Sequence, residues 1–326
     1  MFMMRFDMRA PDGGAPPAEL YRAALDMAEW GETNGCLAIA ISEHHASPDG
    51  YLPAPLVLAA AMAGRTRRVG IQVAALLLPL HDPIALAEQM AVLDLVSGGR
   101  VSYVLAIGYR PEEYAAFGRD FASRGKRMDD CLAALRQAWT GEPFEYEGRT
   151  VRVLPRPATP GGPPCLLGGG SRAAVRRAAR LGLGMVLQGG DASLAALYRA
   201  ECERHGTTPG AFILPPPDTV TSAFVAEDVD AAWERLGPYL LHDARMYASW
   251  LSDADAVSRS SATTVAELRA ANGPYRIFTP EEAAAYVKQR GILLTQPLCG
   301  GIPPALAWEH LELVAKRVLP AVRGAA

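Results

Sequence analysis

Residues 36–45 read Cys-Leu-Ala-Ile-Ala-Ile-Ser-Glu-His-His, an apolar run that ends abruptly in charged and titratable side chains. A short apolar run bounded by polar residues is typical of a buried strand. Such a strand would carry Glu43, His44 and His45 at its carboxyl end, the edge where parallel α/β folds hold their reacting groups. We therefore expect a parallel α/β fold with its chemistry close to these three residues.

The same alternation of apolar strands and amphipathic helices extends in both directions along the chain. Strands are predicted at residues 2–8, 36–41, 69–77, 101–107, 165–167, 183–188, 219–226 and 292–296. Apolar strands separated by helices indicate parallel strands covered on both sides. The count favours a single (β/α)8 TIM-type barrel domain over residues 1–326. A doubly wound open sheet is the alternative, but the Gly-x-Gly-x-x-Gly pattern expected after its first strand is absent.

Two segments interrupt the alternation. Residues 142–164 are rich in proline and contain two short strand-like runs, which predicts a hairpin insertion. Residues 251–275 are small and polar, which predicts an excursion that could act as a mobile lid.

The composition excludes several classes of protein. With a net charge of −3 and 21% charged residues, the chain gives no reason to expect nucleic acid or an anionic membrane as a partner. Its apolar runs fall short of the roughly 20 residues that a membrane span needs. Five scattered cysteines without a Cys-x-x-Cys pair argue against a disulfide framework or a zinc site. We expect a soluble, cytoplasmic protein.

Short motifs follow one another in a fixed order along the chain. They are Glu43-His44-His45, Pro79-Leu80-His81-Asp82-Pro83, Leu86-Ala87-Glu88-Gln89, the run Leu93 to Arg100, the run Gly108 to Tyr114, and the run Pro297 to Pro304. Taken in order, they give a chain that resembles the bacterial luciferase-like flavin monooxygenases over residues 36–190 and again at 297–304. No single motif would suffice, but the ordered series is specific.

The resemblance implies a flavin-dependent monooxygenase. In that family a separate flavin reductase supplies reduced FMN, which reacts with molecular oxygen to oxidise a small organic substrate. Other relatives on the same scaffold bind a deazaflavin coenzyme of the F-420 type and transfer hydride without oxygen, which is the leading alternative. A third alternative is a barrel that has lost catalysis and only binds flavin or serves as a partner subunit.

His44 is the catalytic residue that the resemblance implies. The first histidine of Glu-His-His faces the flavin in that family, where an imidazole can act as an acid or a base. Neighbouring residues of an extended chain point to opposite sides, so we expect a structural role for His45. Glu43 would orient the pair or belong to the core. No further ligands stand at metal-binding spacing, so no metal site is predicted.

Small residues at the ends of two further strands are the implied contacts of the flavin ring. Ala74 and Ala75 match a small-residue step that in the family has an unusual peptide geometry and lies against the ring. Ala106, Gly108 and Tyr109 end the next strand. Many FMN-using relatives have arginine where this chain has Ile107, which keeps the deazaflavin alternative open. We expect Arg110 and the acidic residues after it to begin a solvated helix. Tyr109, Tyr247 and Trp250 are candidates for lining a substrate pocket.

The turn Gly168-Gly169-Gly170-Ser171 is the predicted phosphate site. Glycines let backbone N–H groups approach an anion, and the helix that follows adds the positive end of its dipole. Gln188, after the next strand, would lie beside it.

The helix predicted at residues 84–96 is apolar around most of its circumference. Such a helix needs burial on two sides, which predicts a homodimer or a larger oligomer. On it, we expect Glu88 to be a buried or interface carboxylate, and Asp94 to be an anchor at the helix end or between helices.

Overall fold

The computed structural model describes residues 1–251 and 256–324. Its contacts divide the chain into two compact units. Unit 1 comprises Met1–Ala40, Ser47–Leu52 and Pro215–Ala326, and unit 2 comprises Ile41–Ala46 and Pro53–Leu214. Each is described by itself.

Unit 1 is built on parallel strands in the order β11 (Tyr275–Phe278), β10 (Ser222–Val225), β12 (Leu293–Thr295), β1 (Phe2–Phe6) and β2 (Cys36–Ile41). The last residue of β2 already belongs to unit 2. Its helices are α1 (Pro17–Thr33), α8 (Val229–Trp250), α9 (Val265–Ala270), α10 (Pro280–Arg290), α11 (Pro304–Leu313) and α12 (Leu319–Arg323). Strand β10 is buried at every position, as expected for a parallel strand covered on both sides.

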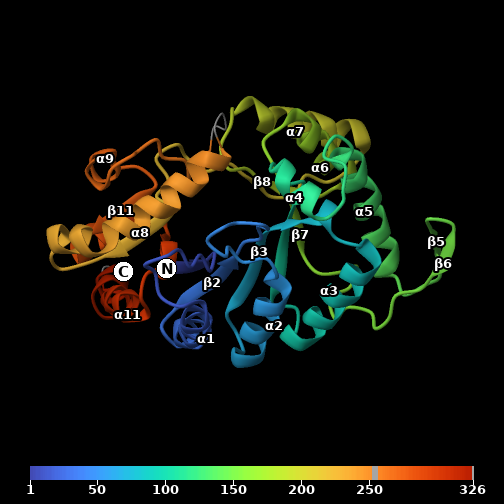
Figure 1. The fold of residues 1–326 in the computed structure, drawn as a ribbon. Helices are drawn as coiled ribbons and strands as arrows, with labels where there is room; N and C mark the ends of the chain where they lie inside the picture. The colour runs from blue at the N-terminus through green and yellow to red at the C-terminus, as the bar shows by residue number, and fades with distance from the viewer. Residues whose placement is uncertain (252–255, 325–326) are drawn as a thin grey trace. The chain divides into compact units, whose positions relative to one another are not determined.

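Unit 2 has parallel strands in the order β3 (Gly70–Leu77), β4 (Val101–Ala106), β7 (Cys165–Gly168), β8 (Gly184–Val186) and β9 (Phe212–Ile213). Its helices are α2 (Pro55–Arg65), α3 (Pro83–Ser97), α4 (Pro111–Ala116), α5 (Arg124–Ala138), α6 (Arg172–Leu181) and α7 (Ser193–His205). Within residues 142–164, β5 (Phe144–Tyr146) and β6 (Arg149–Val151) pair as an antiparallel hairpin, which projects beyond α5 (Figure 1).

Helix α3 shows how local sequence sets the ends of these elements. The Asp82 carboxylate caps its first turn by accepting from the N–H groups of Ile84 and Ala85, and Gly98 ends it in the left-handed conformation that glycine tolerates. Just beyond, the Arg100 guanidinium donates to the carbonyl groups of Ala63, Thr66, Ser97 and Val69 and to the Thr66 hydroxyl. This arginine therefore joins the ends of α2 and α3 to the start of β3.

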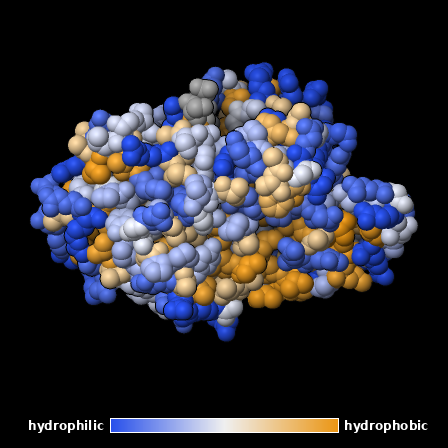
Figure 2. Space-filling model, in the orientation of Figure 1, coloured by the Kyte–Doolittle hydropathy of each residue, from blue (hydrophilic) through white to orange (hydrophobic). Residues whose placement is uncertain are grey.

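The outer face of α3 is apolar and exposed. Leu86, Met90 and Leu93 are buried, whereas Val92, Leu95 and Val96 are 47%, 47% and 55% exposed. Val57 of α2 is also exposed, and Figure 2 shows apolar atoms gathered over the region of these two helices. Asp94 is the anchor that the sequence predicted, because it accepts hydrogen bonds from the backbone and hydroxyl of Thr159. Glu88 is exposed on the single chain, so the expectation that it is buried there is wrong.

Two strands and one helix were not predicted. Strands β9 and β11 are short. Helix α9 lies within the segment that composition alone marked as a polar excursion, residues 251–275, and β11 begins at the last residue of that segment. Of that segment, residues 252–255 lie outside the described residues. Over the rest of the chain that the structure describes, no helix is both long and apolar enough to cross a membrane.

Candidate active site

His44 lies just after β2 and is buried in unit 2. Its Nδ1 is 2.8 Å from Glu113 Oε1, and its Nε2 is 3.1 Å from the Tyr109 hydroxyl. Burial alone would raise the pKa of Glu113, but hydrogen bonds from His44 and the His45 backbone, together with the charge of Arg110, lower it. Because an ionised carboxylate only accepts hydrogen bonds, Nδ1 carries a proton. In the neutral imidazole, Nε2 is then left to accept from Tyr109.

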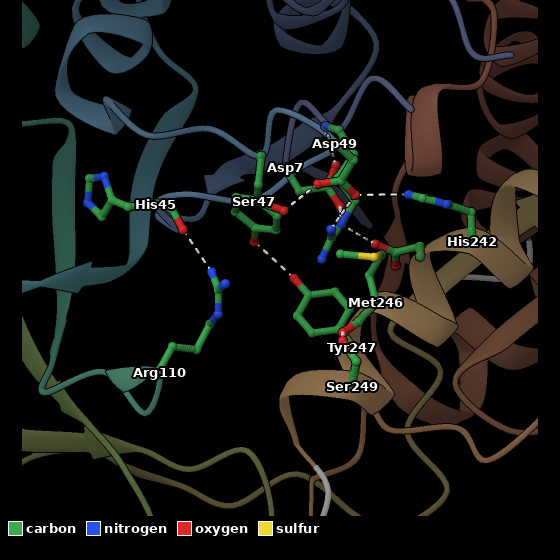
Figure 3. A network of polar contacts seen from close by, with 12 residues as sticks. Asp7, His45, Ser47, Asp49, Arg110, His242, Met246, Tyr247 and Ser249 are labelled. Carbon is green, nitrogen blue, oxygen red and sulfur yellow. Dashed lines mark hydrogen bonds and ion pairs between the residues drawn. The ribbon is translucent and has the colours of Figure 1, made fainter. Parts of the chain in front are cut away.

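Glu113 is the site residue that the sequence interpretation missed. It is 0% exposed, and Arg110 is 7% exposed, so the expectation of a solvated helix start is wrong. Pro111 occupies the first position of α4, which places Glu113 one turn in, where a carboxylate can reach back past the helix start. The Arg110 guanidinium donates to Glu113 Oε1 at 3.2 Å. It also donates to the His45 carbonyl at 2.8 Å (Figure 3). A proline followed two residues later by glutamate was the available signal.

His45 and Glu43 form a second, separate group. Glu43 Oε1 is 2.9 Å from His45 Nε2 and 2.8 Å from His81 Nε2, and Oε2 accepts from the Leu77 N–H at 2.6 Å. Burial would raise the pKa of Glu43, but the bonds from the two imidazoles and the backbone lower it to about 2. The two imidazoles of residues 44 and 45 thus have different carboxylate partners. Among the described residues, no cluster of histidine, cysteine or acidic side chains could hold a metal ion.

The predicted small-residue step lies beside this segment. The Ala74–Ala75 peptide bond is cis, and the register between β3 and β4 shifts between Ala74 and Leu76. The Glu43 N–H donates to the Ala75 carbonyl at 3.3 Å, which fixes the chain around His44 against the end of β3.

The remaining predicted positions follow along the carboxyl ends of neighbouring strands. Ala106 ends β4 opposite Leu77 of β3, and Gly108 and Tyr109 come directly after it. Gly168 ends β7 so close to β4 that a Cβ added there would lie 3.3 Å from the Ala106 Cβ. Ala106, Ile107, Gly108 and Tyr109 are all half-buried. The structure therefore brings the ends of β3, β4 and β7 together as one row of small residues.

The glycine turn has the form expected of an anion site. Gly169 has a φ of +133°, and Ser171 caps α6 by accepting from the Ala174 N–H at 3.1 Å. A Cβ added at Gly170 would lie 3.5 Å from the Gly189 carbonyl oxygen, so the loops after β7 and β8 approach each other closely. Gln188, in the second of these loops, is exposed, as are Ser171 and Arg172.

Comparison with known proteins agrees with this geometry. Residues 2–288 match the family model described as luciferase-like monooxygenase. An uncharacterised protein of Mycobacterium bovis is 37% identical over 140 residues, 41% of this chain and 48% of that protein. The oxygenase component of a flavin-dependent trigonelline monooxygenase from Acinetobacter baylyi is 30% identical over 132 residues, 40% of this chain and 36% of that protein. The chain thus spans about half the length, or less, of these curated relatives.

Two solved structures share the fold over nearly the whole chain. Monooxygenase RslO1 from Streptomyces bottropensis has a TM-score of 0.77 at 24% identity, covering 98% of this chain and 99% of that one. The oxygenating constituent of 3,6-diketocamphane monooxygenase from Pseudomonas putida, solved with FMN, has a TM-score of 0.69 at 19% identity, covering 99% and 98%. At these identities the likeness shows the fold alone, and it confirms the predicted parallel α/β barrel class.

Proposed function

The chain belongs to the luciferase-like monooxygenase family, and from that premise we propose that it is a flavin-dependent monooxygenase that uses reduced FMN and molecular oxygen to oxidise a small organic substrate. The observation that carries the proposal is the buried His44–Glu113 pair, placed beside a row of small residues at the ends of neighbouring strands. The activity named for the trigonelline relative and the FMN found in the diketocamphane enzyme support it.

The residues present fit a flavin mononucleotide. Ala74, Ala75, Ala106 and Gly108 offer backbone and small side chains to a flat ring, because bulky groups at these positions would hold the ring away. The turn Gly168–Ser171 and the start of α6 would hold the phosphate, with Arg172 exposed beside them. Gln188 would contact the same end of the cofactor. When bound, reduced flavin supplies the electrons with which oxygen is activated.

The proposed task of His44 is to hold and move a proton at Nε2. The Glu113 carboxylate accepts from Nδ1 and stabilises the imidazolium when Nε2 takes up a proton. The Tyr109 hydroxyl, 3.1 Å from Nε2, is placed to pass that proton on. Glu113 acts through His44 and is therefore a positioning residue.

The choice of cofactor is tested by an anaerobic titration of the purified protein with reduced FMN and, separately, with reduced deazaflavin of the F-420 type. Because Ile107 supplies no charged donor, we expect reduced FMN to bind mainly through its phosphate and to be released readily. Tighter binding of the deazaflavin would favour the hydride-transfer alternative. Binding of reduced FMN without oxygen consumption in the presence of a flavin reductase, over a panel of small organic substrates, would favour a non-catalytic barrel.

We further propose that a separate reductase supplies the reduced flavin, as the printed name "oxygenase component" suggests for the trigonelline relative. We also propose a cytoplasmic location, since the five cysteines are all free thiols, and a single barrel domain that combines both units.

A homodimer is the assembly we propose. Val57, Val92, Leu95 and Val96 form an exposed apolar face on α2 and α3 that a second copy would cover. Light scattering should give twice the chain mass of 34.8 kDa, and Val96→Glu should reduce it to one chain. A monomer mass for the wild-type protein at micromolar concentration would contradict this.

A further inference from the structure

Unit 1 contains an open groove of about 470 Å³ that the proposed chemistry does not use. Its walls are the loop of residues 11–14 after β1, one face of α8, and Gly300. Cavities of about 300–1,000 Å³ are the usual size for small-molecule ligands. All of the lining residues belong to unit 1, whereas His44, the small-residue row and the glycine turn belong to unit 2.

A basic stripe runs along the wall formed by α8. Arg235, His242 and Arg245 line the groove together with Pro238, at spacings of three and four residues that keep a helix on one face. Asp12 is the single carboxylate among the lining residues. Two arginines and one imidazole therefore stand against a single carboxylate among the lining side chains.

The two arginines of the stripe differ in whether an acidic side chain pairs with them. Arg235 forms two hydrogen bonds with Glu309, of 2.9 and 2.8 Å, which neutralise it. Arg245 is exposed and has no ion-pair partner among residues 1–251 and 256–324. Its charge is the one available to a ligand in the groove.

A hydrogen bond to Asp49 holds the His242 ring in one orientation. Its Nε2 is 2.9 Å from Asp49 Oδ2 (Figure 3), and Asp49 is held in turn by Arg9 Nη1 at 2.5 Å and by the Ser47 hydroxyl. Burial would raise the pKa of Asp49, but the bonds from His242, Arg9 and Ser47 keep it well below its usual range. Asp49 is therefore a carboxylate, so Nε2 carries the proton of this hydrogen bond, and Nδ1 is the ring nitrogen left for a ligand.

The groove wall formed by the loop of residues 11–14 exposes backbone at its two glycines. Gly13 has a φ of +86°, and a Cβ added there would meet no atom within 4 Å, whereas Gly14 packs against the Gly301 carbonyl. A ligand can approach Gly13 closely on the side where a Cβ would stand, because no atom lies within 4 Å of that position.

We propose that this groove binds a small oxyanion, with Arg245 as its charged anchor and His242 as its second contact. The oxyanion is either the carboxylate of a small organic acid or a phosphate group, since a guanidinium pairs with both through two parallel hydrogen bonds. The site assigns an anionic ligand to the protein in addition to the cofactor.

The test is calorimetric titration of the full-length protein with three probes: benzoate, its uncharged counterpart benzamide, and inorganic phosphate. We expect one site that binds benzoate or phosphate but not benzamide. The anion that binds more tightly shows whether the natural ligand carries a carboxylate or a phosphate group. Arg245→Gln should weaken binding at least tenfold, and His242→Gln should weaken it less, because glutamine keeps an N–H donor. Arg22→Gln is the matched control, since Arg22 is an exposed arginine on α1 of the same unit.

Two results would overturn the proposal. One is binding of benzoate and phosphate that survives Arg245→Gln, or that Arg22→Gln weakens equally, since the anion would then respond to general charge or lie elsewhere. The other is the absence of saturable binding of either anion at millimolar concentration. Arg245 is exposed, so its variant should keep the wild-type melting temperature, and loss of binding would report the site rather than unfolding.

Discussion

Each unit contains a buried cluster of charged side chains, and the two clusters are built differently. In unit 2, His44 lies between the buried Glu113 and the half-buried Tyr109, so this titratable imidazole contacts a hydroxyl that is partly exposed to solvent. In unit 1, Arg9 is 0% exposed, forms ion pairs with Asp49 and Asp243, and lies 4.5–5.0 Å from the centroids of Tyr51, Tyr247 and Trp250. Arginine stays charged at every ordinary pH. Buried charge alone therefore does not mark a reacting centre, and we propose that a titratable group in contact with a half-buried hydroxyl does.

The largest expected effect is the difference in turnover between variants of the two neighbouring histidines, His44 and His45. His44→Ala should keep its fold and most of its cofactor affinity, yet lose roughly 10²–10⁴-fold in turnover, the usual range for a positioned acid or base. His45→Ala should instead lower the melting temperature, because Glu43 loses one of its two imidazole partners. Turnover and thermal melting measured side by side decide this, and equal rate losses with intact folds would show that the roles are wrongly assigned.

The Arg9 cluster should respond in stability rather than in rate. Arg9→Met leaves Asp49 and Asp243 buried without their cation, which typically costs about 3–5 kcal/mol of the free energy of unfolding. Turnover per folded molecule should change little. Denaturant unfolding measures the first quantity and an active-site titration the second, with Arg22→Met as the exposed control. A folded, fully stable Arg9→Met protein would mean that the aromatic rings alone hold this region.

Glu113→Gln tests whether the carboxylate positions His44. An amide can accept from Nδ1 but cannot stabilise the imidazolium as a charge does, so turnover should fall roughly tenfold to a hundredfold. The pH profile of turnover should also move, which loss of packing alone would not cause. Because the pKa of Glu113 is lowered in the folded state, its contribution to stability is present above the unfolded value and is lost as the pH falls through the folded one. The wild-type protein should therefore lose more stability in acid than the variant, and parallel acid unfolding curves would contradict this.

Ser171→Ala should weaken cofactor binding by about 1–2 kcal/mol if its hydroxyl contacts the phosphate. The same change removes the cap of α6, which by itself costs about 1 kcal/mol of stability. Thr279→Ala is the matched control, because it removes the cap of α10 in unit 1. Gly170→Leu should weaken binding further, since a bulky side chain would crowd Gly189. Unchanged affinity in both unit 2 variants would place the phosphate elsewhere.

The smallest effect concerns Asp7, beside Arg9. Burial and the neighbouring Asp243 raise the pKa of Asp7 to about 7, although Arg9 and Arg5 oppose them. Between the unfolded value near 4 and this folded value, the folded protein holds more protons, so its stability should fall as the pH rises. Asp7→Asn should remove that decline in thermal melts between pH 4 and 7. A steeper decline in the variant would show that Asp7 is ionised in the folded protein.

The apolar periodicity was sufficient to predict most of the fold. The strand Cys36–Ile41 and the helix Arg172–Leu181 agree with the structure to the residue, because a short apolar run and an amphipathic repeat are both strong local signals. Strands β9 and β11 were missed, since two to four residues carry too little pattern. The division of contacts into two units has no local sequence signal.

Some residues of the candidate site could likewise be predicted from the sequence, and others could not. Residues such as Ala75 and Ala106 could be named as candidates because the family resemblance implies contacts at the ends of their strands, and parallel strands end at a common edge. Glu113 could not, because its contact with His44 joins positions 69 residues apart through a short helix. Tyr247 was expected to line a substrate pocket, but it is buried against Arg9, and its hydroxyl lies 2.9 Å from that of Tyr51. Such polar pairings depend on tertiary packing, which hydropathy does not report.

The Arg100 side chain also has a consequence for how unit 2 opens. Its hydrogen bonds hold the last turn of α2, the first residue before β3 and the end of α3 through one guanidinium. Fraying at either helix end would have to break bonds shared with the other. Amide hydrogens near Ala63, Thr66 and Ser97 should therefore exchange with deuterium at a common rate, as one cooperative opening unit. In Arg100→Met the two helix ends should exchange independently and faster.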